Sequence, residues 1–254
     1  MNWHKALLLF LWVMPHALLG VLAFFLCKRR LYREFPVFFA YVLSEIAEFV
    51  LLFSLYSVLG VTSKPYKYAY CATLLLSIAL RFGVINESAK DLFREYKLLR
   101  VSGIRVLQYA TGLLLAVGVL LTVYAPGQSA NWYSDIFVAN RGAAMIQLGV
   151  LLSLLVFSRF MGLSWRRPAF GIALGLAILA GIDLVVHAIR SEFSSHAWVQ
   201  YLSLLATGTY FVCVLIWIGY LLLPEPKPAS IAVLPHDEVE TWNTEFQRLL
   251  RAKD

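Results

Sequence analysis

The chain has 254 residues, of which 60% are hydrophobic and only 15% are charged, and its formal net charge is +7. Soluble domains carry about 25% charged residues, so this composition excludes a water-soluble globule and indicates a protein embedded in a lipid bilayer. Lys and Arg lie in short stretches between apolar segments rather than along one polar face, which argues against nucleic-acid binding. Cys27, Cys71 and Cys213 lie within or at the ends of apolar segments, as expected of buried cysteines rather than a disulfide framework.

Seven apolar stretches are each long enough to cross about 30 Å of hydrocarbon as a helix. They are residues 5–27, 36–60, 66–87, 104–125, 135–161, 168–190 and 197–223. The first is long for the apolar region of a secretory signal and ends at Cys27-Lys28-Arg29-Arg30, so we predict that it is a helix of the folded protein. The sequence therefore predicts an all-α polytopic membrane protein, with a seven-transmembrane-helix bundle in residues 1–223.

The distribution of basic residues predicts the orientation of this bundle. The loops after the first, third and fifth predicted helices hold twelve Lys and Arg residues. The other side holds only Lys5, Lys64, Lys67 and Arg190. Because cytoplasmic loops are enriched in basic residues, we predict that the N terminus lies outside and the C terminus lies in the cytoplasm.

The sequence after the last predicted helix changes character. Residues 224–236 form a proline-containing linker, and residues 237–254 are predicted to form a cytoplasmic amphipathic helix that Asp237 can cap. One apolar stripe of this helix contains Val239, Trp242, Phe246 and Leu249. The stripe is expected to lie in the lipid headgroup layer, or to pack against the bundle or a cytoplasmic partner protein.

Ionisable residues inside the predicted helices fall at matching depths. At 1.5 Å per residue, Arg141 and Asp183 both lie roughly 10 Å below the outer surface. Glu45 and Arg81 both lie at roughly 22 Å, with Glu48 one turn above Glu45. A charge in the bilayer interior costs about 2.5–3.5 kcal/mol on insertion scales, so such groups are expected to pair. We predict two ion pairs: Arg141 with Asp183, and Arg81 with Glu45 or Glu48.

The outer layer of charge is the predicted ligand-binding site. Its expected residues are Arg141, Asp183, His187, Asn140, Gln147 and Trp132. An arginine in a shallow polar cavity suits a carboxylate or phosphate, so we expect an outward-facing cleft that binds a small anionic ligand. The deeper group is predicted to be a buried charge cluster that serves as a two-state element. It contains Glu45, Glu48, Arg81 and His16, the last beside Pro15, which is expected to kink its helix.

Other functions fit parts of this pattern. Two glutamates share one arginine, and the surplus carboxyl group could carry a proton in a proton-coupled transporter of a small anionic solute. Asp183-x-x-x-His187 has metal-ligand spacing, as in an intramembrane metal-dependent hydrolase, although the depths of the other candidate ligands do not converge. We therefore predict no metal, no cofactor and no catalytic residue, and an enzyme is the less favoured class. Both charged layers could also be purely structural clasps between helices.

Small residues predict close helix packing around residues 171–181. Gly171 and Gly175 have the spacing that lets two membrane helices approach closely. We interpret this pair as packing within the bundle rather than as a dimer interface.

Two segments carry a resemblance to known proteins. They are residues 84–96, VINESAKDLFREY, and residues 29–36, RRLYREFP. With the helix number and orientation, they resemble a family of small uncharacterised bacterial seven-helix integral membrane proteins. The layout also loosely resembles the seven-helix sensory modules of bacterial histidine kinases, although no kinase domain follows the last predicted helix. The first resemblance implies a multi-pass protein of the bacterial inner (plasma) membrane but brings no known activity. The leading hypothesis is a receptor-like or small-ligand-binding protein.

Overall fold

A computed structural model of the chain describes residues 3–60, 63–93, 132–160, 166–192 and 196–222. The chain divides into two units, Met1–Leu223 and Pro224–Asp254. The predicted helix at residues 104–125 and the predicted tail helix, with Val239, Trp242, Phe246 and Leu249, lie outside the described residues.

All regular secondary structure in the described residues is helical. Its elements are α1 (Trp3–Lys28), the short 3-10 helix η1 (Leu31–Arg33), α2 (Pro36–Leu59), α3 (Lys64–Leu92), α5 (Trp132–Phe160), α6 (Pro168–Glu192) and α7 (His196–Leu222). Proline at the first position of α2 and near the start of α3 fits its preference for a helix N terminus, where its missing N–H is not needed. The prediction of an all-helical protein is confirmed for these residues.

Five of the described helices are long and apolar enough to cross a membrane. The spans are Pro36–Leu59, Lys64–Leu92, Asn140–Phe160, Pro168–Ile189 and Tyr201–Leu222, and α1 adds the shorter apolar stretch Val13–Lys28. Many large apolar side chains on these helices are exposed, among them Phe24, Val58, Phe160 and Leu205. In water such a surface would be unfavourable, whereas hydrocarbon chains can cover it.

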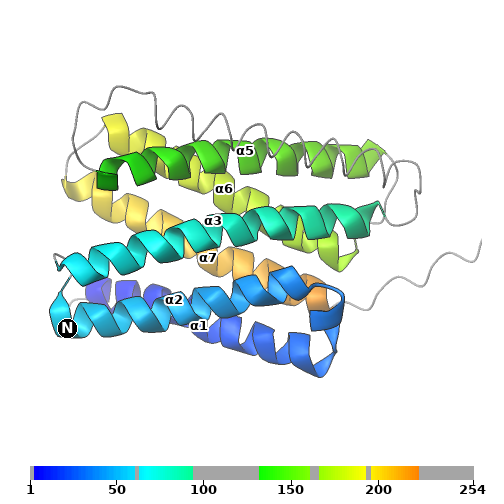
Figure 1. Ribbon diagram of the computed structural model, residues 1–254, viewed down its shortest axis with the longest axis horizontal. Coiled ribbons are helices and arrows are strands. Elements are labelled where there is room, and N and C mark those ends of the chain that lie inside the picture. The colour runs from blue at the N-terminus through cyan, green and yellow to red at the C-terminus, as the bar shows by residue number, and fades with distance from the viewer. Residues whose placement is uncertain (1–2, 61–62, 94–131, 161–165, 193–195, 223–254) are drawn as a thin grey trace, which may run out of the picture. The chain divides into compact units, whose positions relative to one another are not determined.

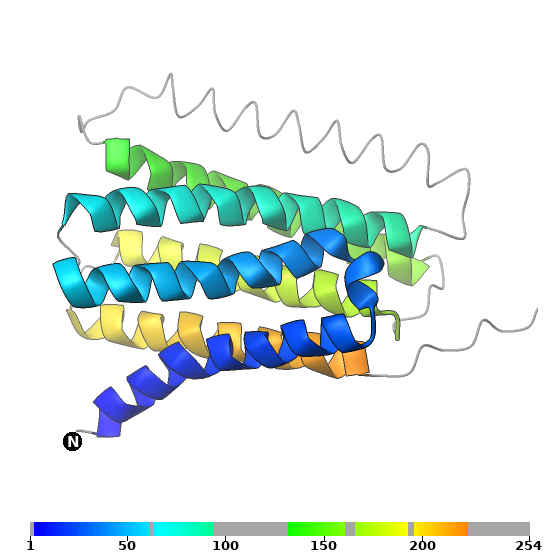
Figure 2. The ribbon, with the colours of Figure 1, turned by 60° about the horizontal axis from the view of Figure 1, so that its bottom comes forward.

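Five helices form a closed ring of contacts. The contacts run from α1 to α2, α3, α6 and α7 and back to α1, while α5 packs outside this ring against α3 and α6 (Figures 1 and 2). Helix α1 continues through Pro15, and Figure 2 shows its N-terminal part diverging from α7. Side chains on the inner faces of the ring are therefore able to meet one another.

The described helices cross the bundle in two opposite directions, so each end of the bundle collects the C termini of one set and the N termini of the other. One end, here called the basic end, is where α1, α3, α5 and α7 finish and α2 and α6 begin (Figure 1). It carries Lys28, Arg29, Arg30, Arg33 and Lys90. The other end is called the opposite end below.

Two polar clasps tie helix termini together at the basic end. Backbone N–H groups of Val37 and Phe38 donate to the Glu87 carboxylate at 2.9 and 2.8 Å, so a side chain of α3 caps the N terminus of α2. The Arg29 guanidinium donates to the carbonyl oxygens of Leu221 and Leu222 at 2.7 and 3.3 Å. These bonds satisfy backbone groups that a helix end leaves without partners.

The glycines of α6 accommodate large side chains of α7. A Cβ atom added at Gly171 would overlap the Tyr220 ring, and one at Gly175 would overlap the Trp217 ring. Trp217 is fully buried, and its indole N–H donates to the Ile172 carbonyl at 3.3 Å. The glycine pair therefore serves close packing inside the bundle, as predicted.

Among the side chains that the structure describes, the largest fully buried ones lie in the half of the bundle near the basic end. The largest fully buried side chains include Leu19, Leu22, Leu26, Phe38, Tyr41, Ile85, Leu92, Leu151, Ile172 and Trp217. Each lies in the half of its helix nearer that end. Phe38 and Tyr41 pack edge-on against Trp217, with ring centroids 5.4 and 6.1 Å apart. This aromatic group closes the interior of the bundle on the basic side.

Candidate functional site

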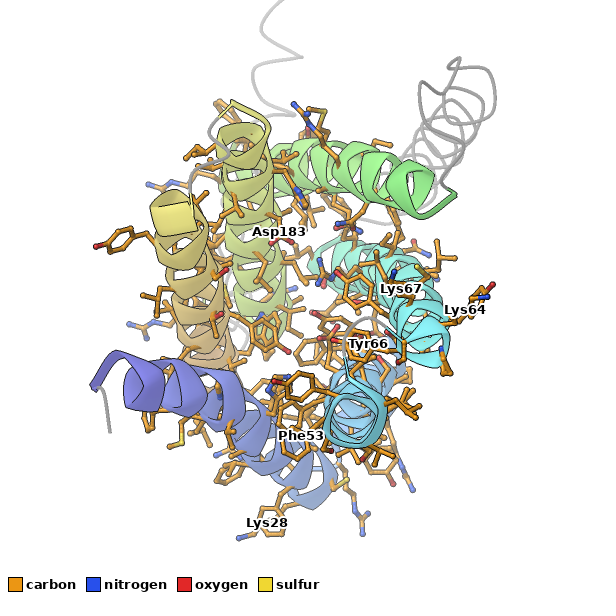
Figure 3. All side chains as sticks on the ribbon, turned by 90° about the vertical axis from the view of Figure 1, so that its left-hand side faces the viewer. Lys28, Phe53, Lys64, Tyr66, Lys67 and Asp183 are labelled. Atoms are coloured by element: carbon orange, nitrogen blue, oxygen red, sulfur yellow. The ribbon has the colours of Figure 1, made fainter. Side chains whose placement is uncertain are left out.

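An ion pair crosses the interior between α3 and α6. A terminal nitrogen of Arg81 lies 3.5 Å from a carboxylate oxygen of Asp183. The two side chains keep 18% and 32% of their surface accessible although they face each other on neighbouring helices of the ring. Figure 3 shows Asp183 on the side of α6 that faces α3. A charged pair that stays accessible at this position indicates room for water or a small molecule.

Glu45 connects α2 to both of the helices that flank the ion pair. One carboxylate oxygen accepts a hydrogen bond from the Ser77 hydroxyl of α3 at 2.7 Å, and the other accepts one from the Tyr210 hydroxyl of α7 at 3.2 Å. Arg81 interacts electrostatically with Glu45 as well as with Asp183. Four helices thus contribute to one network of charge and hydrogen bonds.

The network does not satisfy all of its own buried polar atoms. Within the described residues, the Tyr41 hydroxyl and the Nε of Arg81 are buried and have no hydrogen-bond partner. Tyr41 interacts electrostatically with both Glu45 and Arg81, so its hydroxyl belongs to the same network. Buried polar atoms normally have partners, and Tyr41 and Arg81 lie close enough to interact with each other, so the network retains unused hydrogen-bonding capacity.

Glu48 lies beside this network without a basic partner. It interacts electrostatically with Glu45 and Arg81 and lies near Thr73. Within the described part of the cluster, the ion pair joins Arg81 to Asp183, so neither glutamate has a basic residue at ion-pair distance. We call the group of Glu45, Glu48, Arg81, Asp183, Tyr41, Ser77 and Tyr210 the interior polar cluster.

Aromatic rings of α1, α2 and α7 lie next to the interior polar cluster. The His16 ring stacks on Phe49 with centroids 4.1 Å apart, and it lies 5.9 Å from the Tyr210 ring. Phe49 follows Glu48 in the sequence, and Tyr210 is bonded to Glu45. His16 therefore lies close to the cluster, in the region of the bundle where it was predicted.

The structure brings together charged residues that the sequence analysis assigned to two separate layers. Asp183, expected in the outer layer with Arg141, instead pairs with Arg81, which was expected to pair deeper with Glu45 or Glu48. The depth estimate compared Cα heights, whereas a long arginine stem can carry its charge well along the helix axis. The predicted pair of Arg141 with Asp183 is therefore wrong, and so is the separation of the charges into two layers.

Arg141 lies outside this network because its side chain is exposed. Of its predicted neighbours, Asn140 is partly buried, and Gln147 is only 3% exposed. The Gln147 side-chain nitrogen has no hydrogen-bond partner among the described residues. His187 is partly buried, and Trp132 begins α5 but its side chain lies outside the described part. Asp183 thus belongs to the interior polar cluster, and the ligand site built on Arg141 stays a prediction.

Three members of the cluster were not assigned to the site in the sequence analysis. Tyr41, Ser77 and Tyr210 are residues that occur in any apolar helix as interhelical contacts, so their type alone carried no signal. Their spacing does carry one, because Tyr41 precedes Glu45 by one turn, as Ser77 precedes Arg81. Polar residues one turn from an intramembrane charge could therefore have been included.

The described residues contain no group of three or more His, Cys, Asp or Glu side chains that could hold a metal ion. Asp183 and His187 are both among them, so the predicted metal-ligand spacing is not completed by a third ligand there. The hydrolase alternative consequently has no metal site in this part of the chain.

These features define a helical protein with membrane-length apolar spans and a charged, partly accessible interior. No protein-family model, curated protein or solved structure matches the chain, so its own residues carry the functional argument.

Proposed function

We propose that the protein is a receptor-like integral membrane protein that binds a small polar ligand in the interior polar cluster. The observation that carries this proposal is the accessible Arg81–Asp183 pair, which lies beside buried polar atoms that lack protein partners. A purely structural clasp would be expected to satisfy its own hydrogen bonds, because each unpaired buried group costs about 1–3 kcal/mol. A ligand or ordered water would supply those bonds.

Packing of the described residues closes the interior on the basic side. The fully buried side chains lie toward the basic end, and the aromatic group of Phe38, Tyr41 and Trp217 closes the interior there. Asp183 lies beyond that group, toward the opposite end, and is one-third accessible. The interior polar cluster therefore lies on the far side of this aromatic group from the basic end.

The proposal includes the topology expected from the sequence. Seven transmembrane helices, an outer N terminus and a cytoplasmic C terminus place the basic end in the cytoplasm and the interior polar cluster open to the outside. On this basis the protein is a multi-pass member of the family of small bacterial seven-helix membrane proteins that it resembles, located in the inner membrane. Reporter fusions at the C terminus and between α2 and α3 test this orientation, because a cytoplasmic reporter should be active only at the former.

Ligand binding can be tested on the full chain in lipid nanodiscs. A library of small polar compounds is screened for those that raise the unfolding temperature. A ligand at 100 times its Kd stabilises by about 2.7 kcal/mol, which corresponds to roughly 5–10 °C for a chain of this size. The same compounds should lose this effect with Asp183→Asn and keep it with Lys64→Gln, an exposed residue that points away from the bundle (Figure 3). Equal stabilisation of wild type and Asp183→Asn by every active compound would refute the site, as would a complete absence of active compounds.

A second function is favoured by the excess of carboxyl groups. Glu45, Glu48 and Asp183 surround one arginine, and an unpaired carboxyl group in a membrane interior suits the proton site of a proton-coupled carrier. In proteoliposomes loaded with candidate solutes, Glu48→Gln should then abolish uptake that depends on a pH gradient. Unchanged uptake with this variant would rule out that role for Glu48.

A further inference from the structure

We infer that the interior polar cluster binds a small organic cation of the ammonium class. This inference rests on the proposed ligand-binding function and names the chemistry of its ligand. It replaces the anionic ligand expected while Arg141 was placed at the site. The observation behind it is the meeting of three carboxyl groups, one guanidinium and several aromatic rings on the inner faces of α2, α3, α6 and α7.

The first argument is the balance of charge. Asp183 and Arg81 form an ion pair, which leaves Glu45 and Glu48 to be balanced. Both glutamates interact electrostatically with Arg81, and Glu48 also interacts with Glu45, so the groups share one field. An anion entering this field would meet three carboxyl groups, whereas a cation would neutralise part of their charge.

The second argument concerns which carboxyl group is free to receive a cation. Both oxygens of Glu45 accept hydrogen bonds from Ser77 and Tyr210, and Asp183 is paired with Arg81. Glu48 lies one turn from Glu45 toward the opposite end, and its carboxyl group, which interacts with the Thr73 hydroxyl, keeps further capacity to accept hydrogen bonds. Its carboxyl group is therefore the expected counter-ion of the ligand.

The third argument is the aromatic surface next to the interior polar cluster. The Tyr210 ring, whose hydroxyl is bonded to Glu45, lies 5.9 Å from the His16 ring, and His16 in turn covers one face of Phe49 by stacking on it at 4.1 Å. Faces of aromatic rings attract cations, and ammonium ligands are commonly held by aromatic groups together with a carboxylate. A neutral polar ligand or an inorganic anion would gain little from these rings.

The test compares three probes with the same carbon chain: butylammonium, butyrate and 1-butanol. Each is titrated into the full chain in nanodiscs of neutral lipid, and the unfolding temperature gives an apparent affinity. Butylammonium should stabilise the wild type, whereas butyrate and 1-butanol should not. Glu48→Gln should weaken the apparent affinity for butylammonium by about ten- to hundredfold, as expected for loss of a charge-assisted bond. Glu48→Asp, which retains the charge, should recover part of this loss.

Glu34→Gln is the matched control, because it removes the same charge from an exposed side chain at the basic end. It should leave the butylammonium affinity unchanged. Stabilisation by butyrate alone would overturn the cation inference and leave ligand binding intact. The inference would also fail if butylammonium had no effect while compounds from the library screen acted through Asp183. If neither the three probes nor any library compound stabilised the protein, both the cation inference and the proposed function would fail.

Discussion

Separating the Arg81–Asp183 pair by mutation tests the arrangement of the interior directly. The experiment is a double-mutant cycle with Arg81→Gln, Asp183→Asn and the combined variant. The charged atoms are 3.5 Å apart. Two unit charges about 4 Å apart attract by about 4 kcal/mol at an effective dielectric constant of 20.

Solvent reduces this value, because the two side chains keep 18% and 32% of their surface accessible. Fully exposed pairs contribute at most about 1 kcal/mol, and breaking a fully buried pair costs about 3–5 kcal/mol. We therefore expect a coupling energy of about 1–3 kcal/mol, with the combined variant less destabilised than the sum of the single variants. Reversible unfolding in nanodiscs or mild detergent measures the four stabilities.

A parallel cycle with Arg141→Gln and Asp183→Asn provides the comparison. Arg141 is exposed, so its coupling to Asp183 should stay within about 0.5 kcal/mol of zero. A larger coupling for Arg141 than for Arg81 would refute the assignment of the ion pair. It would also restore the two-layer arrangement expected from depth alone.

Two other substitutions probe the packing that holds the site in place. Gly175→Ala should destabilise the bundle by about 1–3 kcal/mol, because its new methyl group would overlap the Trp217 ring. In the control variant Gly149→Ala the methyl group meets open space, so this change should be neutral or slightly stabilising. Equal unfolding temperatures of the two variants would contradict close packing of α6 on α7. Glu87→Gln should lower the free energy of unfolding by about 1–2 kcal/mol, because a neutral amide accepts weaker hydrogen bonds from the first turn of α2. The control variant Glu34→Gln should change it by less than about 0.5 kcal/mol. Hydrogen exchange should show faster opening of that turn in Glu87→Gln alone, and unchanged exchange would exclude the cap.

The helices could be predicted from the sequence because length and apolarity are local properties. Five described helices contain spans of membrane length, close to the apolar stretches marked in the sequence. Gly171 and Gly175 were also interpreted correctly, since only a missing side chain lets Tyr220 and Trp217 approach α6. These features depend on residues near one another in the chain or on a well-defined spacing.

The partners of the charges could not be predicted in the same way. Which charges meet depends on the rotation of each helix about its axis, on the order of helices around the ring and on side-chain reach. Depth alone paired Asp183 with Arg141, whereas the order of helices brings α3 next to α6 and allows Arg81 to reach Asp183. The hydrogen bonds of Glu45 to Ser77 and Tyr210 likewise join helices far apart in sequence.

The most direct test of the account asks whether water reaches Asp183 from within the bundle. Asp183→Cys and Val185→Cys are prepared in a chain that carries Cys27→Ser, because Cys27 is exposed whereas Cys71 and Cys213 are buried. Val185 is 46% exposed on an apolar surface, where lipid rather than water should cover it.

Both variants are treated in nanodiscs with a charged, membrane-impermeant thiol reagent, and the labelled fraction is measured by mass spectrometry. The account predicts rapid labelling of Asp183→Cys and little labelling of Val185→Cys. Labelling of Val185→Cys alone, or of neither variant, would contradict a water-accessible polar site inside the helix bundle.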